Sequence, residues 1–160
     1  MKKNLFPALL MLVLTVFGAG GAGTVHADEE PGTGTVSPVI DPDGADPFVL
    51  KTEDGYLYTK TTGSDVSLSR ADSILKLGAA EATVVYRPEG ALKDLWAPEI
   101  WNLDGCWYIY FAATVPGEEM HRMYVLRNLS EDPLQGTWEC LPMEGMDDKF
   151  AIDGTILELD

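Results

Sequence analysis

Short runs of alternating apolar and polar residues dominate the sequence from Asp41 onward. These runs are residues 56–59, 106–111 and 123–126. Alternation with a period of two puts successive side chains on opposite faces of a strand, so each run predicts a half-buried strand. Asp54-Gly55 and Asp104-Gly105 come just before two of these runs, and an Asp-Gly pair between apolar segments indicates a tight hairpin turn. The pattern therefore predicts an all-β protein built from hairpins.

Two stretches depart from the strand pattern. Residues 69–77 predict a short helix in which Ile74, Leu75 and Leu77 would cover a neighbouring surface. Residues 28–40 are rich in Pro, Gly and acidic side chains, which is typical of a flexible lead-in. We therefore expect the folded domain to occupy residues 41–160.

A strand–turn–strand unit recurs along the chain. Residues 45–50 precede the first Asp-Gly turn, and residues 96–101 precede the second about fifty residues later. A third copy begins with residues 151–157. Repeats of this length with several short strands are typical of β-propeller blades, whereas an immunoglobulin-like sandwich has no reason to repeat the unit. Residues 41–160 thus predict a partial propeller of about two blades and the first strand of a third, the N-terminal part of a longer domain.

The first 27 residues have the features of a secretion signal. Lys2 and Lys3 precede an apolar run over residues 5–17, and the small side chains of Val25 and Ala27 suit cleavage after Ala27. The alternative is a membrane anchor, but the run is shorter than the roughly 20 residues that a spanning helix needs. Residues 1–27 therefore predict a secreted or periplasmic protein with no membrane attachment after cleavage.

The charge and the cysteine content of the chain disfavour nucleic acid and zinc as ligands. The chain carries 11 Lys and Arg against 26 Asp and Glu, a formal net charge of −15, whereas a nucleic-acid binder needs a basic surface. Cys106 and Cys140 are the only cysteines, and without a CxxC pair or a histidine cluster a zinc site is disfavoured. The pattern puts them on the second and fourth strands of one unit, which are not neighbours in a meander. Two buried free thiols are therefore predicted rather than a disulfide.

Acidic residues recur where the innermost strand of each unit begins. They are Asp46 in the first unit, Glu99 near Trp96 in the second, and Asp153 in the third. The innermost strands of a propeller face one central channel, and acids gathered there repel one another and lose hydration, which suits acid–base chemistry. The alternative is that Asp46 and Asp153 are ordinary turn residues, and that Glu99 lies on the polar face of its strand.

Other polar and aromatic residues have plainer interpretations. The remaining large aromatic side chains of the second unit are predicted to fill the core or the contact between blades: Trp101, Trp107, Tyr108, Tyr110 and Trp138. His121 and Arg122 are predicted to lie in a solvated loop, with contact to a ligand at the rim as the alternative. Asn128-Leu129-Ser130 matches the pattern of an N-glycosylation acceptor.

Taken in order, the three unit starts resemble glycoside hydrolase family 43, a family of five-bladed propeller enzymes that includes arabinofuranosidases, endo-arabinanases and xylosidases. The resemblance rests on residues 45–49, 95–100 and 151–154, with residues 104–111 after the second start. It implies that Asp46 is the general base that activates a water. It implies that Asp153 tunes the pKa of the general acid and orients the substrate. Trp96 would be a platform whose indole covers the apolar face of a sugar, with packing between blades as the alternative.

The resemblance also implies residues that the sequence does not contain. The general acid is a Glu of the fourth blade, and in many members a fifth-blade His helps to hold a central metal. We therefore expect the 160-residue chain to be inactive by itself and to need no cofactor, with a central calcium ion left open for the full-length protein.

The function that the resemblance implies is hydrolysis of O-glycosidic bonds in arabinose- or xylose-containing plant polysaccharides. Family members invert the anomeric configuration, which needs two carboxyl groups roughly 6.5–9.5 Å apart with a water between them. Two alternatives come from other classes. One is a non-catalytic carbohydrate-binding propeller, which needs the aromatic residues but not Asp46 and Asp153. The other is a structural all-β surface domain.

Overall fold

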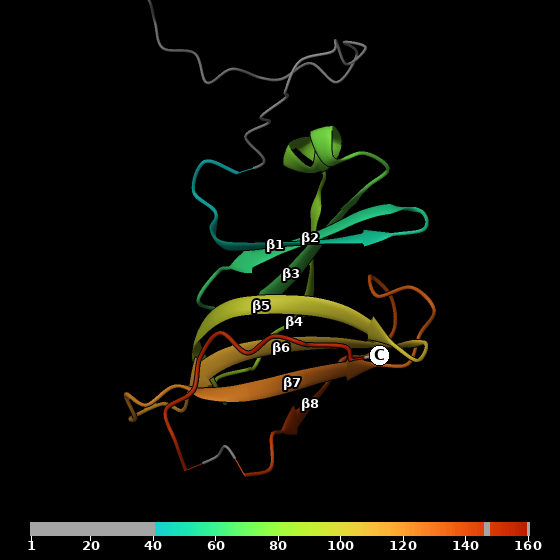
Figure 1. Cartoon of the computed structure of the whole chain (residues 1–160). Helices are drawn as coiled ribbons and strands as arrows, with labels where there is room; N and C mark the ends of the chain where they lie inside the picture. Colours follow the sequence, from blue (N-terminus) through green and yellow to red (C-terminus); the bar gives the residue numbers. More distant parts are fainter. Residues whose placement is uncertain (1–40, 146–147, 160) are drawn as a thin grey trace, which may run out of the picture.

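The computed structural model describes residues 41–145 and 148–159. It contains two four-stranded antiparallel sheets, each with its strands in chain order (Figure 1). The first sheet consists of β1 (Ala45–Thr52), β2 (Gly55–Thr61), β3 (Val66–Ala71) and β4 (Ala82–Tyr86). The second sheet consists of β5 (Lys93–Leu103), β6 (Cys106–Thr114), β7 (Arg122–Asn128) and β8 (Glu139–Pro142). The all-β prediction is confirmed, and the predicted signal peptide and lead-in lie outside the described residues.

Both predicted hairpins form at their Asp-Gly pairs. The β1–β2 hairpin closes over residues 52–55, and the β5–β6 hairpin closes over residues 103–106. In the second turn φ is 52° at Asp104 and 81° at Gly105. Positive φ at both central residues is the backbone of a type I′ turn, whose twist matches that of the flanking strands.

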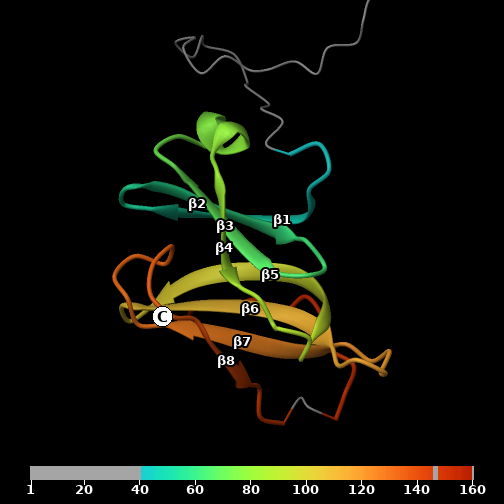
Figure 2. The same ribbon diagram turned by 180° about the vertical axis from the view of Figure 1, so that it is seen from behind.

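The apolar core lies between the two sheets, which are stacked in both views (Figures 1 and 2). A backbone bridge between Gly63 and Leu95 joins the first sheet to the start of β5, with N···O distances of 3.2 Å in both directions. The cluster at the centre comprises Leu57, Val66, Leu68, Leu95, Ile100, Trp107, Ile109, Phe111, Ala113, Leu126 and Trp138. The alternation of β2, β3 and β6 supplies seven of these eleven residues, because every second side chain points to the facing sheet.

The aromatic residues that were predicted to fill space mostly do so. Trp107 and Trp138 belong to the core cluster. Trp101 packs on Phe48 of the first sheet, with ring centroids 5.4 Å apart. Tyr108 and Tyr110 stack on each other, and each is half-buried.

The predicted helix over residues 69–77 is wrong in its first half. Ser69 pairs with both neighbouring strands, so it belongs to β3, and a 3₁₀ helix, η1, covers only Ile74–Ala79. The Ser73 hydroxyl accepts the Leu75 N–H at 3.3 Å and caps this helix. Leu77 is its buried contact. Sheet pairing overrides the local pattern here, because β2 and β4 satisfy the backbone of residue 69 on both sides.

The third repeat unit differs from the prediction as well. Among the described residues 148–159, none is in a strand. The segment instead runs along the second sheet (Figure 1), where the Ala151 N–H donates to the His121 carbonyl at 3.1 Å. A strand needs a continuous ladder of partners, and a single backbone bond does not provide one.

The two cysteines lie on the strands that the repeat pattern assigned to them. Cys106 begins β6, the second strand of its sheet, and Cys140 is in β8, the fourth. Strand β7 separates them, and both thiols are free, as predicted. Both are half-buried rather than fully buried. Burial raises the pKa of the Cys140 thiol, which contacts Tyr86 of the first sheet.

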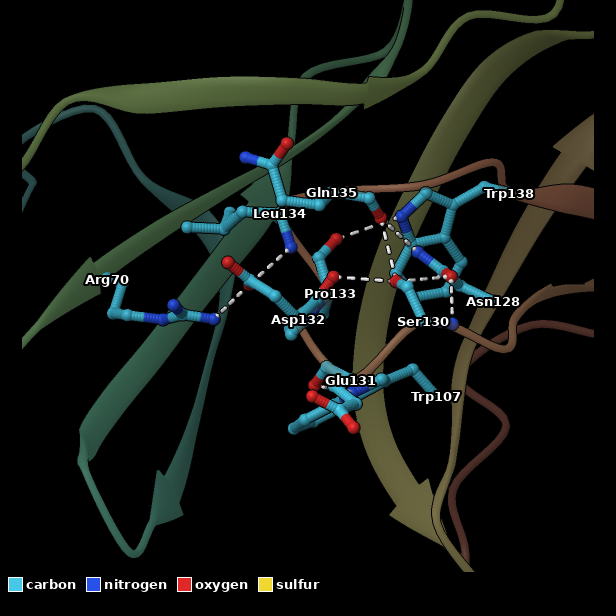
Figure 3. A network of polar contacts seen from close by, with 10 residues as sticks. All are labelled: Arg70, Trp107, Asn128, Ser130, Glu131, Asp132, Pro133, Leu134, Gln135 and Trp138. Carbon is cyan, nitrogen blue, oxygen red and sulfur yellow. Dashed lines mark hydrogen bonds and ion pairs between the residues drawn. The ribbon is translucent and has the colours of Figure 1, made fainter.

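The connection between β7 and β8 is held by buried side chains rather than by regular structure (Figure 3). Asn128 is 1% exposed, and its Oδ1 accepts the N–H of Ser130 at 2.8 Å while its Nδ2 donates to the Gln135 carbonyl at 2.7 Å. The indole N–H groups of Trp107 and Trp138 donate to carbonyls of the same loop. The glycosylation pattern at residue 128 therefore lies at the start of a folded loop, where the Asn128 amide is buried and bonded through both its oxygen and its nitrogen.

Candidate functional site

The two predicted acids and Trp96 lie at backbone irregularities that repeat from unit to unit. The register of β1 shifts between Ala45 and Phe48, and that of β5 shifts between Trp96 and Glu99. Such bulges bend a strand and re-aim the side chains next to them. They therefore place Asp46 and Ala97, which directly follows Trp96, at matching points of two consecutive innermost strands.

Each unit carries a left-handed residue at the equivalent position. The φ angle is 48° at Asp46, 44° at Ala97 and 55° at Asp153. A non-glycine residue in this region costs on the order of 1–3 kcal/mol unless surrounding contacts hold it there. Asp tolerates the conformation better than Ala does, because its short polar side chain can bond locally. The repeat seen in the sequence is thus a repeat of backbone conformation as well.

Asp46 is exposed and is bonded through one of its oxygens. The Thr61 hydroxyl donates to Asp46 Oδ2 at 2.7 Å, and the same hydroxyl accepts the N–H of Ala97 at 2.7 Å. Thr61 ends β2 and pairs with Ala45, so the contact follows from the β1–β2 register. Sequence reasoning missed Thr61 because a threonine at a strand end carries no motif.

Trp96 is 39% exposed, and its indole lies on the imidazole of His121 with ring centroids 3.6 Å apart and planes 23° apart. His121 is only 5% exposed, and its Nε2 is 3.1 Å from the Asp94 carbonyl. The prediction that His121 lies in a solvated loop is therefore wrong. The Trp96 indole covers one face of the ring and Phe150 meets its edge, and local sequence does not reveal these tertiary contacts.

Asp153 is exposed, and the segment that leads to it contacts His121. The ring of Phe150 meets the His121 ring edge-on at 6.4 Å, and the backbone bond from Ala151 fixes the segment that leads to Asp153. The next residue, Gly154, faces Met123: a Cβ added there would lie 2.7 Å from the Met123 methyl. His121, just before β7, thus contacts Trp96, and both His121 and Met123 contact the segment around Asp153.

Glu99 does not join this group of acids. Its Oε2 accepts the indole N–H of Trp101 at 3.3 Å, and the side chain is half-buried. The interpretation of Glu99 as part of the strand's own polar face agrees with this contact.

Thr61 thus contacts both Asp46 and the strand that carries Trp96. His121 contacts both Trp96 and the segment that leads to Asp153. No hydrogen bond or ion pair joins Asp46 to Asp153 in the described part of the chain. Two hollows, of about 240 and 810 Å³, are lined by other residues. Asp46, Trp96 and Asp153 are all exposed.

Residues 41–145 and 148–159 contain no group of three or more His, Cys, Asp or Glu side chains placed to hold a metal ion. They also contain no helix with the length and apolar character to cross a membrane.

The described residues thus form two consecutive four-stranded meanders with bulges at the start of their first strands, an all-β repeat. The sequence matches the glycosyl hydrolases family 43 over residues 35–160, and the chain belongs to that family. It is 34% identical over 153 residues to an extracellular exo-alpha-(1->5)-L-arabinofuranosidase of Streptomyces chartreusis, covering 86% of this chain and 46% of that protein. It is 35% identical over 118 residues to alpha-L-arabinofuranosidase 43 of Humicola insolens, covering 69% of this chain and 24% of that protein.

The fold is shared with a solved relative. The crystal structure of alpha-L-arabinofuranosidase from Lactobacillus brevis matches with a TM-score of 0.64 and 31% identity, over 72% of this chain and 41% of that chain. The chain thus spans less than half the length of each of these three relatives.

Proposed function

We propose that this chain is the N-terminal part of an inverting glycosidase that releases arabinose or xylose from plant polysaccharides, built on a five-bladed propeller. The observation that carries the proposal is the bonded carboxylate of Asp46 at a left-handed bulge, next to the strand that presents the exposed indole of Trp96. Its membership of family 43 and relatives named arabinofuranosidases support the substrate class.

In this proposal Asp46 is the general base. The Thr61 hydroxyl donates to Oδ2. No group in the described part of the chain donates to Oδ1, so that oxygen can accept a proton from water. The activated water attacks the anomeric carbon from the face opposite the leaving group, so the configuration inverts. Proton transfer to a positioned side chain contributes typically 10²–10⁴-fold to the rate.

Asp153 and Trp96 have supporting roles in the proposed reaction. Asp153 orients the substrate and tunes the pKa of the general acid, a Glu that we place on a later blade. The Trp96 indole, fixed on one face by His121, offers its other face to the apolar C–H side of the sugar. The described residues provide no cluster for a cation, so a central calcium ion remains a prediction about the whole protein.

We also propose that residues 1–27 direct export and are removed. Relatives from two Streptomyces species are named as extracellular enzymes, which supports a location outside the cytoplasm.

The test compares the 160-residue chain with a longer form read from the gene beyond codon 160. We expect the longer form to release nitrophenol from nitrophenyl α-L-arabinofuranoside or β-D-xyloside, and the 160-residue chain not to. Asp46→Asn in the longer form should lower kcat by about 10²–10⁴-fold. Asp43→Asn, which changes another exposed acid three residues away, is the matched control and should leave kcat unchanged.

Two further readouts separate this proposal from its alternatives. Proton NMR of the first product should show the anomer opposite to that of the substrate, and retention would rule out inversion. Retardation by arabinan in a native gel with no turnover by the longer form would favour a non-catalytic binding propeller. Absence of both would favour a structural domain.

A further inference from the structure

The Thr61 hydroxyl connects the two sheets at the proposed site. Thr61 is the last residue of β2 in the first sheet, whereas Ala97 lies in β5 of the second. The hydroxyl is 2.7 Å from the Ala97 nitrogen and 2.7 Å from Asp46 Oδ2. One oxygen atom therefore contacts both left-handed bulges at once.

The direction of these two bonds is fixed by their chemistry. A backbone N–H can only donate, so Ala97 must use a lone pair of the Thr61 oxygen. The single hydroxyl proton of Thr61 is then committed to Asp46, whose Oδ2 must accept. Oδ2 is held, and Oδ1 is the carboxylate oxygen that remains for water.

The same bonds set the distance between two functional groups. Ala97 directly follows Trp96, and its φ of 44° is unfavourable for alanine. Holding the Ala97 N–H therefore holds the backbone that presents the indole. Movement of either bulge would change the position of the carboxylate relative to the sugar platform.

We propose that Thr61 is a positioning residue that holds the Asp46 carboxylate and the Trp96 backbone in one fixed arrangement. This proposal rests on the proposed function of Asp46 as the base. It concerns a residue that need not touch substrate, and it predicts that loss of the hydroxyl lowers the rate of the chemical step more than it weakens substrate binding.

The chain offers an unusually close control on the same strand. Thr59 lies two residues earlier, so it points to the same face of β2, and its buried Oγ1 has no partner among the described residues. Thr61→Val and Thr59→Val each replace a hydroxyl by a methyl group, but only the first removes bonds. Thr61→Ser keeps the hydroxyl and loses only the methyl group.

The first measurement is NMR on the 160-residue chain. In Thr61→Val we expect the Ala97 amide to exchange with solvent about tenfold faster or more, and the Asp46 carboxyl carbon signal to move. Thr61→Ser should restore both signals, and Thr59→Val should leave both unchanged. Unchanged Ala97 exchange in Thr61→Val would overturn the proposal. Thr61→Ala gives the same comparison where the valine variant does not fold.

The second measurement uses the longer, active form. Thr61→Val should lower kcat by roughly 10–100-fold with KM within about threefold, because misplacement of a reacting group affects the chemical step. Thr61→Ser should recover most of kcat. Equal kcat in Thr61→Val and wild type would overturn the positioning role even if the NMR signals change. Full activity of Asp46→Asn would instead refute the proposed base, whereas the NMR result still decides whether Thr61 holds this carboxylate.

Discussion

The loop between β7 and β8 allows a quantitative prediction for Asn128→Ala. The Asn128 amide is buried, and it bonds the Ser130 N–H at 2.8 Å and the Gln135 carbonyl at 2.7 Å. Removing it leaves the Ser130 N–H without its partner and takes away one of the two donors to the Gln135 carbonyl, which the Ser130 hydroxyl also contacts at 2.9 Å. A buried polar group that loses its partner costs about 1–3 kcal/mol.

We therefore expect Asn128→Ala to lower the free energy of unfolding by about 2 kcal/mol. With a urea m-value of about 1.5 kcal/mol per molar, the midpoint falls by about 1.3 M. The assay is urea unfolding of the 160-residue chain followed by tryptophan fluorescence. The indoles of Trp107 and Trp138 bond to the same loop and report its loss (Figure 3).

The control for this prediction is the neighbouring residue. Leu129 is 69% exposed, so Leu129→Ala should change the free energy of unfolding by less than about 0.5 kcal/mol. Asn128→Asp keeps the acceptor for Ser130 but sets a carboxylate against the Gln135 carbonyl, and should also destabilise. If Asn128→Ala unfolds within 0.5 kcal/mol of wild type, with an unchanged m-value, the loop is not held by this amide and the reasoning is refuted.

Three further predictions concern contacts between elements. The hydrogen bond from Arg70 lowers the pKa of Asp132, so their ion pair stabilises the fold above the carboxyl's unfolded pKa of about 3.9 and loses that effect as pH falls through the lowered value. Because both side chains are more than one-third exposed, Arg70→Ala should cost only about 0.2–1 kcal/mol in urea unfolding at pH 6 and less near pH 3; an equal cost at both pH values would contradict this. Burial raises the pKa of Cys140, so at pH 8 its thiol should react with Ellman's reagent more slowly than Cys106, as measured in the two single Cys→Ser variants, and faster reaction would contradict it. His121→Ala should redshift the fluorescence of the indole stacked on it and weaken retention by arabinan, and an unchanged spectrum would show that the stack does not hold the indole.

Local sequence determined much of the fold. Period-two alternation and two Asp-Gly pairs predicted the β1–β2 and β5–β6 hairpins, because both signals act between residues that are close in the chain. The repeat identified the matching starts of the first two innermost strands. The helix over residues 69–77 and the third-unit strand failed where pairing partners decide the outcome: Ser69 has partners on both sides, and the 151–157 segment has one backbone bond.

The sequence by itself singled out Asp46, Trp96 and Asp153, because they stand where the repeated units begin. Only the tertiary structure decided what surrounds them. Thr61 bonds to Asp46 on the neighbouring strand and to Ala97 in the other sheet. His121, just before β7, stacks on the Trp96 indole. Such contacts join residues that are distant in the chain, and a threonine or histidine carries no local pattern that announces its partner. The packing of one sheet on the other therefore determines the surroundings of the candidate site.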